Sequence, residues 1–281
     1  MALQWYPGHM TKARRELGEL MPSQDLVLEV LDARLPAASS NPVVTELRRD
    51  KPCIKVLTKS DLADPEVTRA WLQHVQRDDK VAAFASTSER PQEARKRVAE
   101  LAARFGLRGT RDRPLRALIA GVPNVGKSTL INALMDRLVA KTGDKPAVTK
   151  VQQRVVLPGG MIVTDSPGLM WPKIEDEAGA LRLAFAGSIP DTALDYLTIG
   201  LFGAALLLAG YPALVAARFK LDAVPSNAEA LLTEIGRRRG GLRSGGTVDL
   251  HKASEILVHE FRQGLIGRIS LESPGATTNA P

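Results

Sequence analysis

A glycine-rich loop that ends in a lysine and a serine carries the clearest chemistry in the sequence. Residues 121–128, GVPNVGKS, fit the pattern G-x-x-x-x-G-K-[ST] in full, between the apolar run 116–120 and the helical run 127–135. Glycines in such a loop let backbone N–H groups surround phosphate oxygens at the positive end of a helix. Lys127 would place its charge near the terminal phosphates, and the Ser128 hydroxyl would bind Mg²⁺. The loop predicts a nucleoside triphosphate site, whose contacts are Asn124, Val125, Gly126, Lys127, Ser128 and Thr129.

A second candidate for the same site is the segment DSPGL at 165–169, about forty residues further on. Asp165 closes an apolar strand and could hold Mg²⁺ through a water molecule, while the Gly168 amide could approach the γ-phosphate. A lone D-x-x-G is as often an ordinary turn, but a preceding phosphate loop favours the functional interpretation. Between the two motifs, Thr149 in KPAVTK could complete the metal shell and order a switch loop. The alternative for Thr149 is an ordinary loop threonine.

The segment TKSD at 58–61 follows the apolar run CIKVL and predicts which base is bound. Guanine presents two donors, N1–H and the exocyclic amine, and the Asp61 carboxylate can accept both. Adenine offers no such pair, so a site built on these bonds rejects it by ~10⁴-fold or more. Lys59 would pack along the base, and the Thr58 hydroxyl could bridge to the phosphate loop. The predicted base contacts are Thr58, Lys59, Ser60 and Asp61, with Ser86 and Thr87 of the loop ASTSE backing the base.

Short apolar runs separated by helical stretches surround these motifs and must position them. Six strands are predicted, at 26–31, 53–57, 81–85, 116–120, 154–158 and 161–165. The first four alternate with helical segments, which is the pattern of βαβ units and a parallel sheet, and the short PGG turn makes the last two a hairpin. We predict an α/β phosphate-loop domain over 1–174, with a mostly parallel sheet and helices on both faces. A small all-α domain over 175–272 and a disordered tail over 273–281 should follow.

The order of the motifs is unusual, because the base-reading segment precedes the phosphate loop by about sixty residues. In many guanine-nucleotide proteins it follows that loop. A circular permutation explains the order, since it moves the termini while keeping every site residue in place. The α/β domain is therefore predicted to be a GTPase domain with a circularly permuted motif order.

The composition is that of a soluble globular protein, with 44% of the 281 residues hydrophobic and 25% charged. The net charge of +7 favours a polyanionic partner, although a solvated basic surface is an equal alternative. The single cysteine, Cys53, cannot form an internal disulfide and fits a reducing compartment. The first residues lack the features of a signal peptide, so a cytoplasmic location is expected.

Residues 197–217 form a stretch without charge that is long enough to span a bilayer. Pro212 breaks the stretch, because proline disfavours helix at the residue before it. Two short helices buried in the helical domain are favoured over a membrane span. No stable membrane association is expected.

Over nearly its whole length the chain resembles the circularly permuted ribosome-assembly GTPases of the bacterial YlqF/RbgA type and their mitochondrial relatives. Thr58 stands where asparagine is commoner, and Ala147 stands where glycine is usual before the switch threonine. The resemblance implies a GTPase that binds GTP and GDP and associates with the maturing large (50S) ribosomal subunit and its rRNA. It also implies that GTP binding and hydrolysis are coupled to a late assembly step. The resemblance rests on QWYPGHMTKA (4–13), DARLPAASSNP (32–42), TKSD, GVPNVGKST, KPAVTK, DSPGL and the segment 236–272.

The group that positions the attacking water is not evident beside the phosphate motifs. Leu169 follows D-x-x-G and cannot orient water as a glutamine does in other GTPases. The resemblance points instead to His9, whose imidazole could position or deprotonate a water, with a structural role in the N-terminal arm as the alternative. Asn124 could help to hold K⁺, or could serve loop geometry alone. With Lys127 and Thr149, His9 completes the predicted catalytic set, and hydrolysis is expected to be slow until the large subunit stimulates it.

Basic residues gather near the end of the chain, with seven Lys and Arg against three acidic residues between 237 and 268. The glycine-rich segment GRRRGGLRSGG suits a phosphate backbone, and Trp5 and Tyr6 add stacking groups at the other end of the chain. This combination favours structured RNA over duplex DNA, with a solvated basic face as the alternative. The first hypothesis is a monomeric GTPase that binds RNA. The others are an RNA-binding scaffold with a structural nucleotide and a membrane-associated GTPase.

Overall fold

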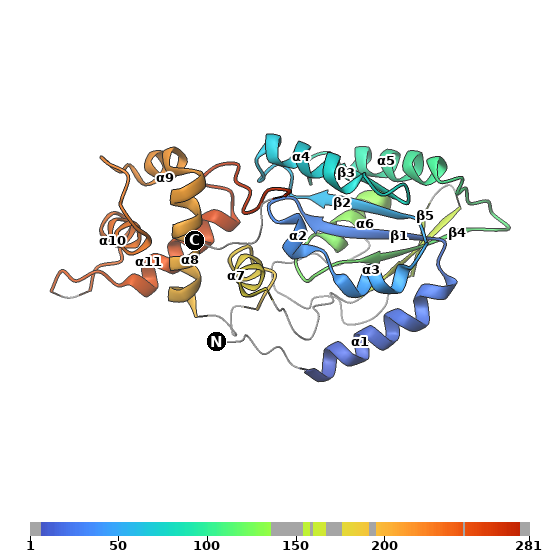
Figure 1. Ribbon diagram of the computed structural model, residues 1–281, viewed down its shortest axis with the longest axis horizontal. Coiled ribbons are helices and arrows are strands. Elements are labelled where there is room, and N and C mark those ends of the chain that lie inside the picture. Colours follow the sequence, from blue (N-terminus) through green and yellow to red (C-terminus); the bar gives the residue numbers. More distant parts are fainter. Residues whose placement is uncertain are drawn as a thin grey trace.

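The computed structural model describes residues 7–135, 154–157, 160–166, 176–190, 195–243 and 245–275. The side chains of residues 7–13 are not among the described groups. Within these ranges the chain forms an α/β part, which contains the sheet, and a helical part (Figure 1). The boundary predicted at 174/175 falls outside the described residues and stays a prediction.

A six-stranded sheet has the order β3-β2-β1-β4-β6-β5. All neighbouring pairs are parallel except β5 and β6, which form an antiparallel pair at one edge. Each of the six predicted strands is confirmed, with ends that differ by no more than a residue, and the last two form the predicted hairpin. The strands are β1 (Leu26–Asp32), β2 (Cys53–Thr58), β3 (Val81–Ala85), β4 (Leu115–Ala120), β5 (Arg154–Leu157) and β6 (Met161–Asp165).

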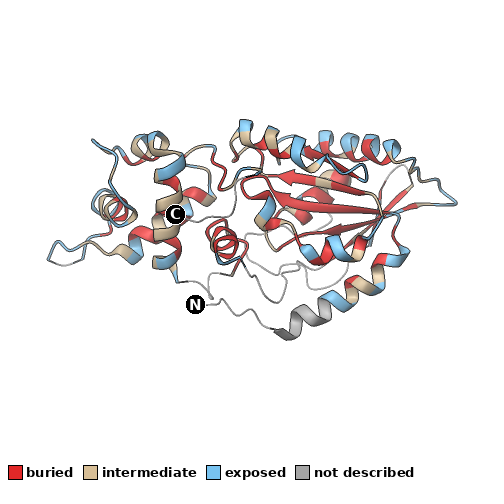
Figure 2. Ribbon diagram, in the orientation of Figure 1, coloured by how far each residue is buried: buried red, intermediate tan, exposed pale blue. Residues whose placement is uncertain are grey.

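Helices cover both faces of this sheet, because its central strands are apolar on both sides. On one face, Leu17 of α1 (Pro7–Leu20) and Val44 of α3 (Pro42–Arg48) pack with the sheet residues Val27 and Leu118. On the other face, α5 (Pro91–Arg104) and α6 (Lys127–Met135) cover the alternate residues of the same strands. Figure 2 shows the resulting buried layer. Two further helices, α2 (Pro36–Ser39) and α4 (Pro65–Val75), follow β1 and β2.

The helical part contains α7 (Glu177–Phe185), α8 (Tyr196–Gly210), α9 (Pro212–Phe219), α10 (Ala228–Arg238) and α11 (Leu250–Arg262). Side chains of Asp195, Asn227 and Asp249 accept backbone N–H bonds at the starts of α8, α10 and α11, which is why these helices begin there. Buried residues of the helices belong to the same hydrophobic cluster as the sheet, so the two parts share a core.

The uncharged stretch 197–217 forms two helices, α8 and α9, as predicted. They meet at a bend of 114°. No single helix among the described residues is long and apolar enough to cross a membrane, although the two helices of this bent pair together have the length and composition of a span. Ala204, Leu207 and Val215 from the pair are fully buried in the protein core.

Residues 268–272 run back from the helical part to the loops that follow β1 and β2. Arg268 donates from Nε to Ala63 O (3.0 Å) and from Nη2 to Ser60 O (2.9 Å). The backbone continues this contact, with N–H bonds from Ile269 to Leu62 O (2.9 Å) and from Leu271 to Arg34 O (2.7 Å). We name residues 268–272 the return segment.

Candidate functional site

The phosphate loop joins β4 to α6 and lies against the central strand β1. Gly121 has φ 157°, and a Cβ there would lie 2.5 Å from Val30 O, so only glycine allows this close approach. Lys127, the first residue of α6, is buried and donates from Nζ to Gly121 O (3.0 Å) and Val122 O (2.8 Å). The ammonium group therefore lies directly over the loop that would surround phosphate oxygens.

Asp165 ends β6 next to this loop, and its environment suits a divalent cation. Burial raises the pKa of Asp165 to about 6, although the Lys127 charge lowers it. Burial lowers the pKa of Lys127 to about 8, and Asp165 opposes that shift. Both carboxyl oxygens of Asp165 are buried without a hydrogen-bond partner among the described residues. Mg²⁺ with its water shell would satisfy these oxygens, with Ser128 as a second ligand, and would neutralise phosphate charge.

A pocket of about 570 Å³ opens beside the phosphate loop, and its lining contains five of the six predicted base contacts, all except Ser60. It contains the carboxylate of Asp61, whose Oδ1 is buried without a hydrogen-bond partner among the described residues. An unsatisfied buried acceptor suits the two donors of guanine, and adenine would leave it unpaired. Its lining includes Thr58, Lys59, Asp61, Ser86, Thr87, Gly126 and Thr129, together with Leu62, Ser88, Pro91, Asn132 and Ala133.

Hydrogen bonds between neighbouring loops hold the walls of this pocket in place. The Thr58 hydroxyl donates to Leu31 O (2.9 Å) and also contacts Val125 O, so it does reach the phosphate loop. Ser60 donates from Oγ to Ser86 O (3.1 Å), and the Ser86 N–H donates to Leu57 O (2.8 Å). The base-reading loop is thereby tied to both loops beside it.

Three predicted residues cannot be placed against the pocket. Thr149 and Gly168 lie outside the described residues, as does Leu169. His9 falls in helix α1, but its side chain is not described. Their roles stay predictions.

Asp32, at the end of β1, is a site residue that was not predicted. It is fully buried and accepts bonds from Lys59 Nζ (2.9 Å), Arg34 Nε (2.9 Å) and Arg34 Nη2 (2.8 Å). Burial opposes ionisation of Asp32, but the two cations outweigh burial and hold its pKa well below the usual range. The available signal was an aspartate at the carboxyl end of an apolar strand, where parallel sheets place their sites.

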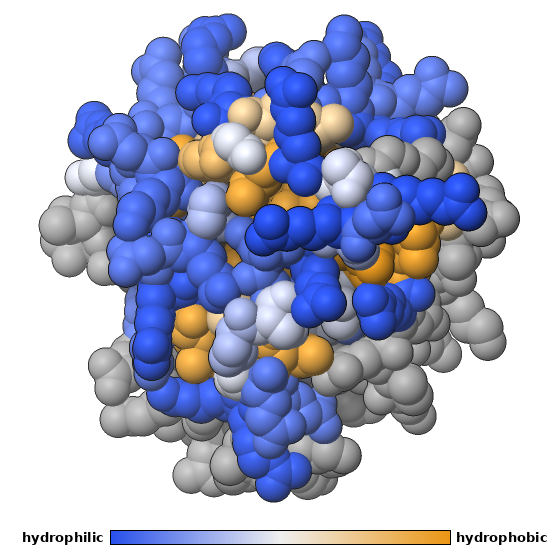
Figure 3. Space-filling view, turned by 90° about the vertical axis from the view of Figure 1, so that its right-hand side faces the viewer, coloured by the Kyte–Doolittle hydropathy of each residue, from blue (hydrophilic) through white to orange (hydrophobic). Residues whose placement is uncertain are grey.

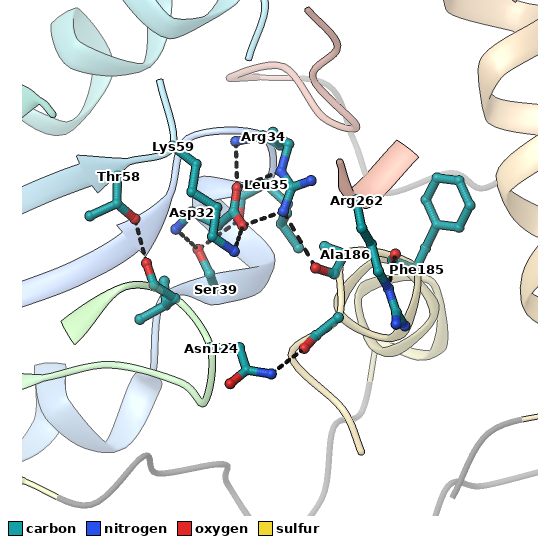
Figure 4. A network of polar contacts seen from close by, with 12 residues as sticks. Asp32, Arg34, Leu35, Ser39, Thr58, Lys59, Asn124, Phe185, Ala186 and Arg262 are labelled. Atoms are coloured by element: carbon teal, nitrogen blue, oxygen red, sulfur yellow. Dashed lines mark hydrogen bonds and ion pairs between the residues drawn. The ribbon is translucent and has the colours of Figure 1, made fainter. Parts of the chain in front are cut away.

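Arg34 and the phosphate-loop residue Asn124 join the nucleotide site to the helical part (Figure 4). Arg34 donates from Nη2 to Ala186 O (3.4 Å), just past the end of α7, and its guanidinium lies 4.9 Å from the ring centroid of Phe261. Asn124 of the phosphate loop donates from Nδ2 to Gly187 O (2.8 Å). From the other side, Arg262 of α11 donates to Ala184 O (2.9 Å) and Phe185 O (3.1 Å). We name residues 184–187 the α7 junction.

Replacing Asp32 by alanine is expected to lower the free energy of unfolding by about 3–5 kcal/mol, because Arg34 would stay buried without its carboxylate. GDP affinity should fall as well, since Lys59 loses the same partner. Urea unfolding and nucleotide titration measure the two effects. Asp50→Ala is the control, because it removes an exposed carboxylate paired with Lys80 and should leave unfolding almost unchanged. Similar losses in both variants would contradict a structural role for the buried network.

A phosphate loop, a buried carboxylate suited to Mg²⁺ and a base pocket with an unsatisfied acceptor meet at the carboxyl edge of a mostly parallel sheet. This combination defines a P-loop GTPase. The family described as "50S ribosome-binding GTPase" matches residues 116–197. The chain belongs to the YlqF/RbgA family of ribosome biogenesis GTPases and hydrolyses GTP.

Relatives that match this chain over nearly its whole length support this assignment. Ribosome biogenesis GTPase A of Bacillus licheniformis is 40% identical over 98% of this chain and 99% of its own length. Mitochondrial ribosome-associated GTPase 1 of Mus musculus is 30% identical over 96% of this chain and 90% of its own length. GNP-bound YlqF from T. maritima superposes with a TM-score of 0.67 at 29% identity, covering 94% of this chain and 99% of that one. The predicted family is thus confirmed.

Proposed function

We propose that this GTPase binds the maturing large (50S) ribosomal subunit through its rRNA and couples GTP binding and hydrolysis to a late assembly step. The observation that carries the proposal is the α7 junction, which the phosphate loop contacts through Asn124 and the loop after β1 contacts through Arg34. Arg34 is linked to Lys59 of the base-reading loop by their shared partner Asp32. A change at the γ-phosphate could alter these contacts and so the placement of the helical part. The names of two relatives, ribosome biogenesis GTPase A and mitochondrial ribosome-associated GTPase 1, support the choice of partner.

The remaining details of the proposal concern chain organisation and ions. We propose a circularly permuted GTPase domain over 1–174, because the loops after β2 and β4 line one pocket, and Asp165 at the end of β6 lies beside Lys127, in spite of the order of these segments in the chain. The helical domain over 175–272 would bind RNA, and 273–281 would be a tail. The protein would act as a cytoplasmic monomer. Mg²⁺ is the proposed divalent ion, and K⁺ at Asn124 the monovalent one.

GTP hydrolysis measured with and without purified 50S particles tests the proposal. Stimulation of about 10²–10⁴-fold is expected if the particle brings an acid–base group such as His9 to the attacking water. His9→Ala should then keep particle binding and lose most of the stimulation. Purified 30S particles are the control and should not stimulate. Tight binding of 50S without any stimulation would favour the alternative, an RNA-binding scaffold whose nucleotide is structural.

A further inference from the structure

A second basic surface lies far from the helical part, at the end of the sheet opposite the nucleotide site. Five arginines and one acidic residue, Asp112, occur between 104 and 116. This segment links α5 to β4, and the six residues of β4 separate it by roughly 20 Å from the phosphate loop. In Figure 1 it extends at one end of the long axis, with α10 and α11 at the other end.

Backbone contacts fix the shape of this basic segment. The Thr110 N–H donates to Arg113 O (3.0 Å), and the Arg113 N–H donates back to the Thr110 hydroxyl (3.0 Å). Gly109 packs so tightly on Gly160 of the β5–β6 turn that a Cβ on Gly109 would overlap Gly160 O. The turn therefore presents its cations from a defined backbone.

The cations of this surface are not paired with acidic side chains among the residues that the structure describes. Five arginines are exposed, and none of them forms an ion pair within the described part of the chain. They are Arg108, Arg111, Arg113, Arg116 and, on the neighbouring strand β5, Arg154. On the adjacent helix α5, by contrast, Arg97 pairs with Glu100. Unpaired like charges held close together repel one another, so a polyanion would gain the full attraction of the group.

A hollow adjoins this surface at Arg116. Arg116 on β4 and Arg154 on the edge strand β5 both line a depression of about 310 Å³, together with Ile162, Thr164 and Leu20. Val156, on the same face of β5 as Arg154, is 65% exposed. Figure 3 views this end of the molecule and shows hydrophilic side chains with small hydrophobic patches between them. Cations beside apolar contacts suit a nucleic-acid backbone better than a simple anion.

We propose that Arg108, Arg111, Arg113 and Arg116, the distal arginine surface, bind the phosphate backbone of RNA. The proposal rests on the proposed ribosomal function and adds a second RNA contact at the opposite end of the molecule from the helical part. Guanidinium groups pair with phosphate through two hydrogen bonds and stack on exposed bases. An RNA partner that touches both ends would hold the GTPase domain between two contacts rather than by one.

The test is a triple variant, Arg108→Gln with Arg111→Gln and Arg113→Gln. Its binding to purified 50S particles and to protein-free rRNA extracted from them should weaken by about tenfold or more. The slope of log affinity against log salt should become shallower by about two, because each phosphate contact contributes ~0.7–0.9 to that slope. GDP affinity and thermal stability should not change, because the three side chains are exposed and distant from the site.

A matched control removes three other exposed cations, through Arg69→Gln, Lys80→Gln and Arg97→Gln. Each of these is paired with an acidic side chain, and the net charge falls by the same amount as in the test variant. The control should keep RNA affinity and salt slope. Equal effects of the two triples, or no effect of the first, would overturn the proposal. Loss of binding to particles but not to protein-free rRNA would also overturn it and assign the surface to a ribosomal protein. Failure of the unmodified protein to bind either probe would instead reject the proposed function itself.

Discussion

Replacing Asp61 by asparagine is expected to weaken GTP and GDP binding by about 10²–10⁴-fold. The buried carboxylate oxygen in the base pocket would become part of an amide, which presents an N–H group to the guanine donors. Xanthine nucleotides should gain affinity, because a carbonyl replaces the exocyclic amine and can accept from that N–H. Titration of the unmodified protein and of the Asp61→Asn variant with GDP, XDP and ADP measures the change.

The unmodified protein supplies the critical comparison for this prediction. If it bound ATP and GTP equally, Asp61 would not be the group that reads the base. Asp50→Asn is a matched control, because it makes the same change on an exposed side chain. It should alter none of the three affinities.

Replacing Lys127 by alanine is expected to reduce GTP hydrolysis by at least ~10³-fold, because the charge nearest the terminal phosphates is lost. The fold should survive the change, because burial of the Lys127 ammonium group is itself unfavourable and lowers its pKa to about 8. Thermal unfolding of the variant distinguishes a loss of catalysis from a loss of stability. Lys96→Ala on the exposed face of α5 is the control and should keep normal turnover. Near-normal hydrolysis by the Lys127 variant would mean that the loop does not bind phosphate as proposed.

The strands and the motif-bearing loops could be predicted from local patterns. Alternating apolar runs identified all six strands, and glycine spacing placed the phosphate loop between β4 and α6. Because parallel strands deliver their following loops to one edge, the meeting of Asp61, Gly126 and Asp165 at that edge also followed from the sequence.

Contacts between distant segments could not be predicted in the same way. The ion pair of Arg34 with Asp32 is local, yet its bond to Ala186 depends on where α7 packs. The periodicity of apolar residues in the sequence does not indicate where one helix packs against a distant loop. The interpretation of Asn124 as a possible K⁺ ligand was likewise made without the Gly187 carbonyl, to which its amide donates.

The return segment changes the design of truncation experiments. The sequence suggests that removing residues after Gly236 would weaken particle binding and spare nucleotide affinity. In the structure such a truncation would also remove Arg268, which holds the backbone of Ser60 and Ala63 in the base-reading loop. Nucleotide affinity is therefore expected to fall in the truncated chain. Substitution of exposed arginines on α10 tests the helical part more cleanly.

The return segment also determines when a newly made chain can complete the hydrogen bonds that support its base-reading loop. About two hundred residues separate Ser60 from Arg268. At ~5–20 residues per second, a ribosome needs roughly 10–40 s to translate that distance. During this interval the nascent chain can form β1, β2 and the phosphate loop, but Ser60 and Ala63 still lack the guanidinium that fixes them. A chain stalled before Arg268 would therefore carry phosphate-binding groups without a fully supported guanine-reading loop, and translation would have to reach the return segment before nucleotide selectivity is complete.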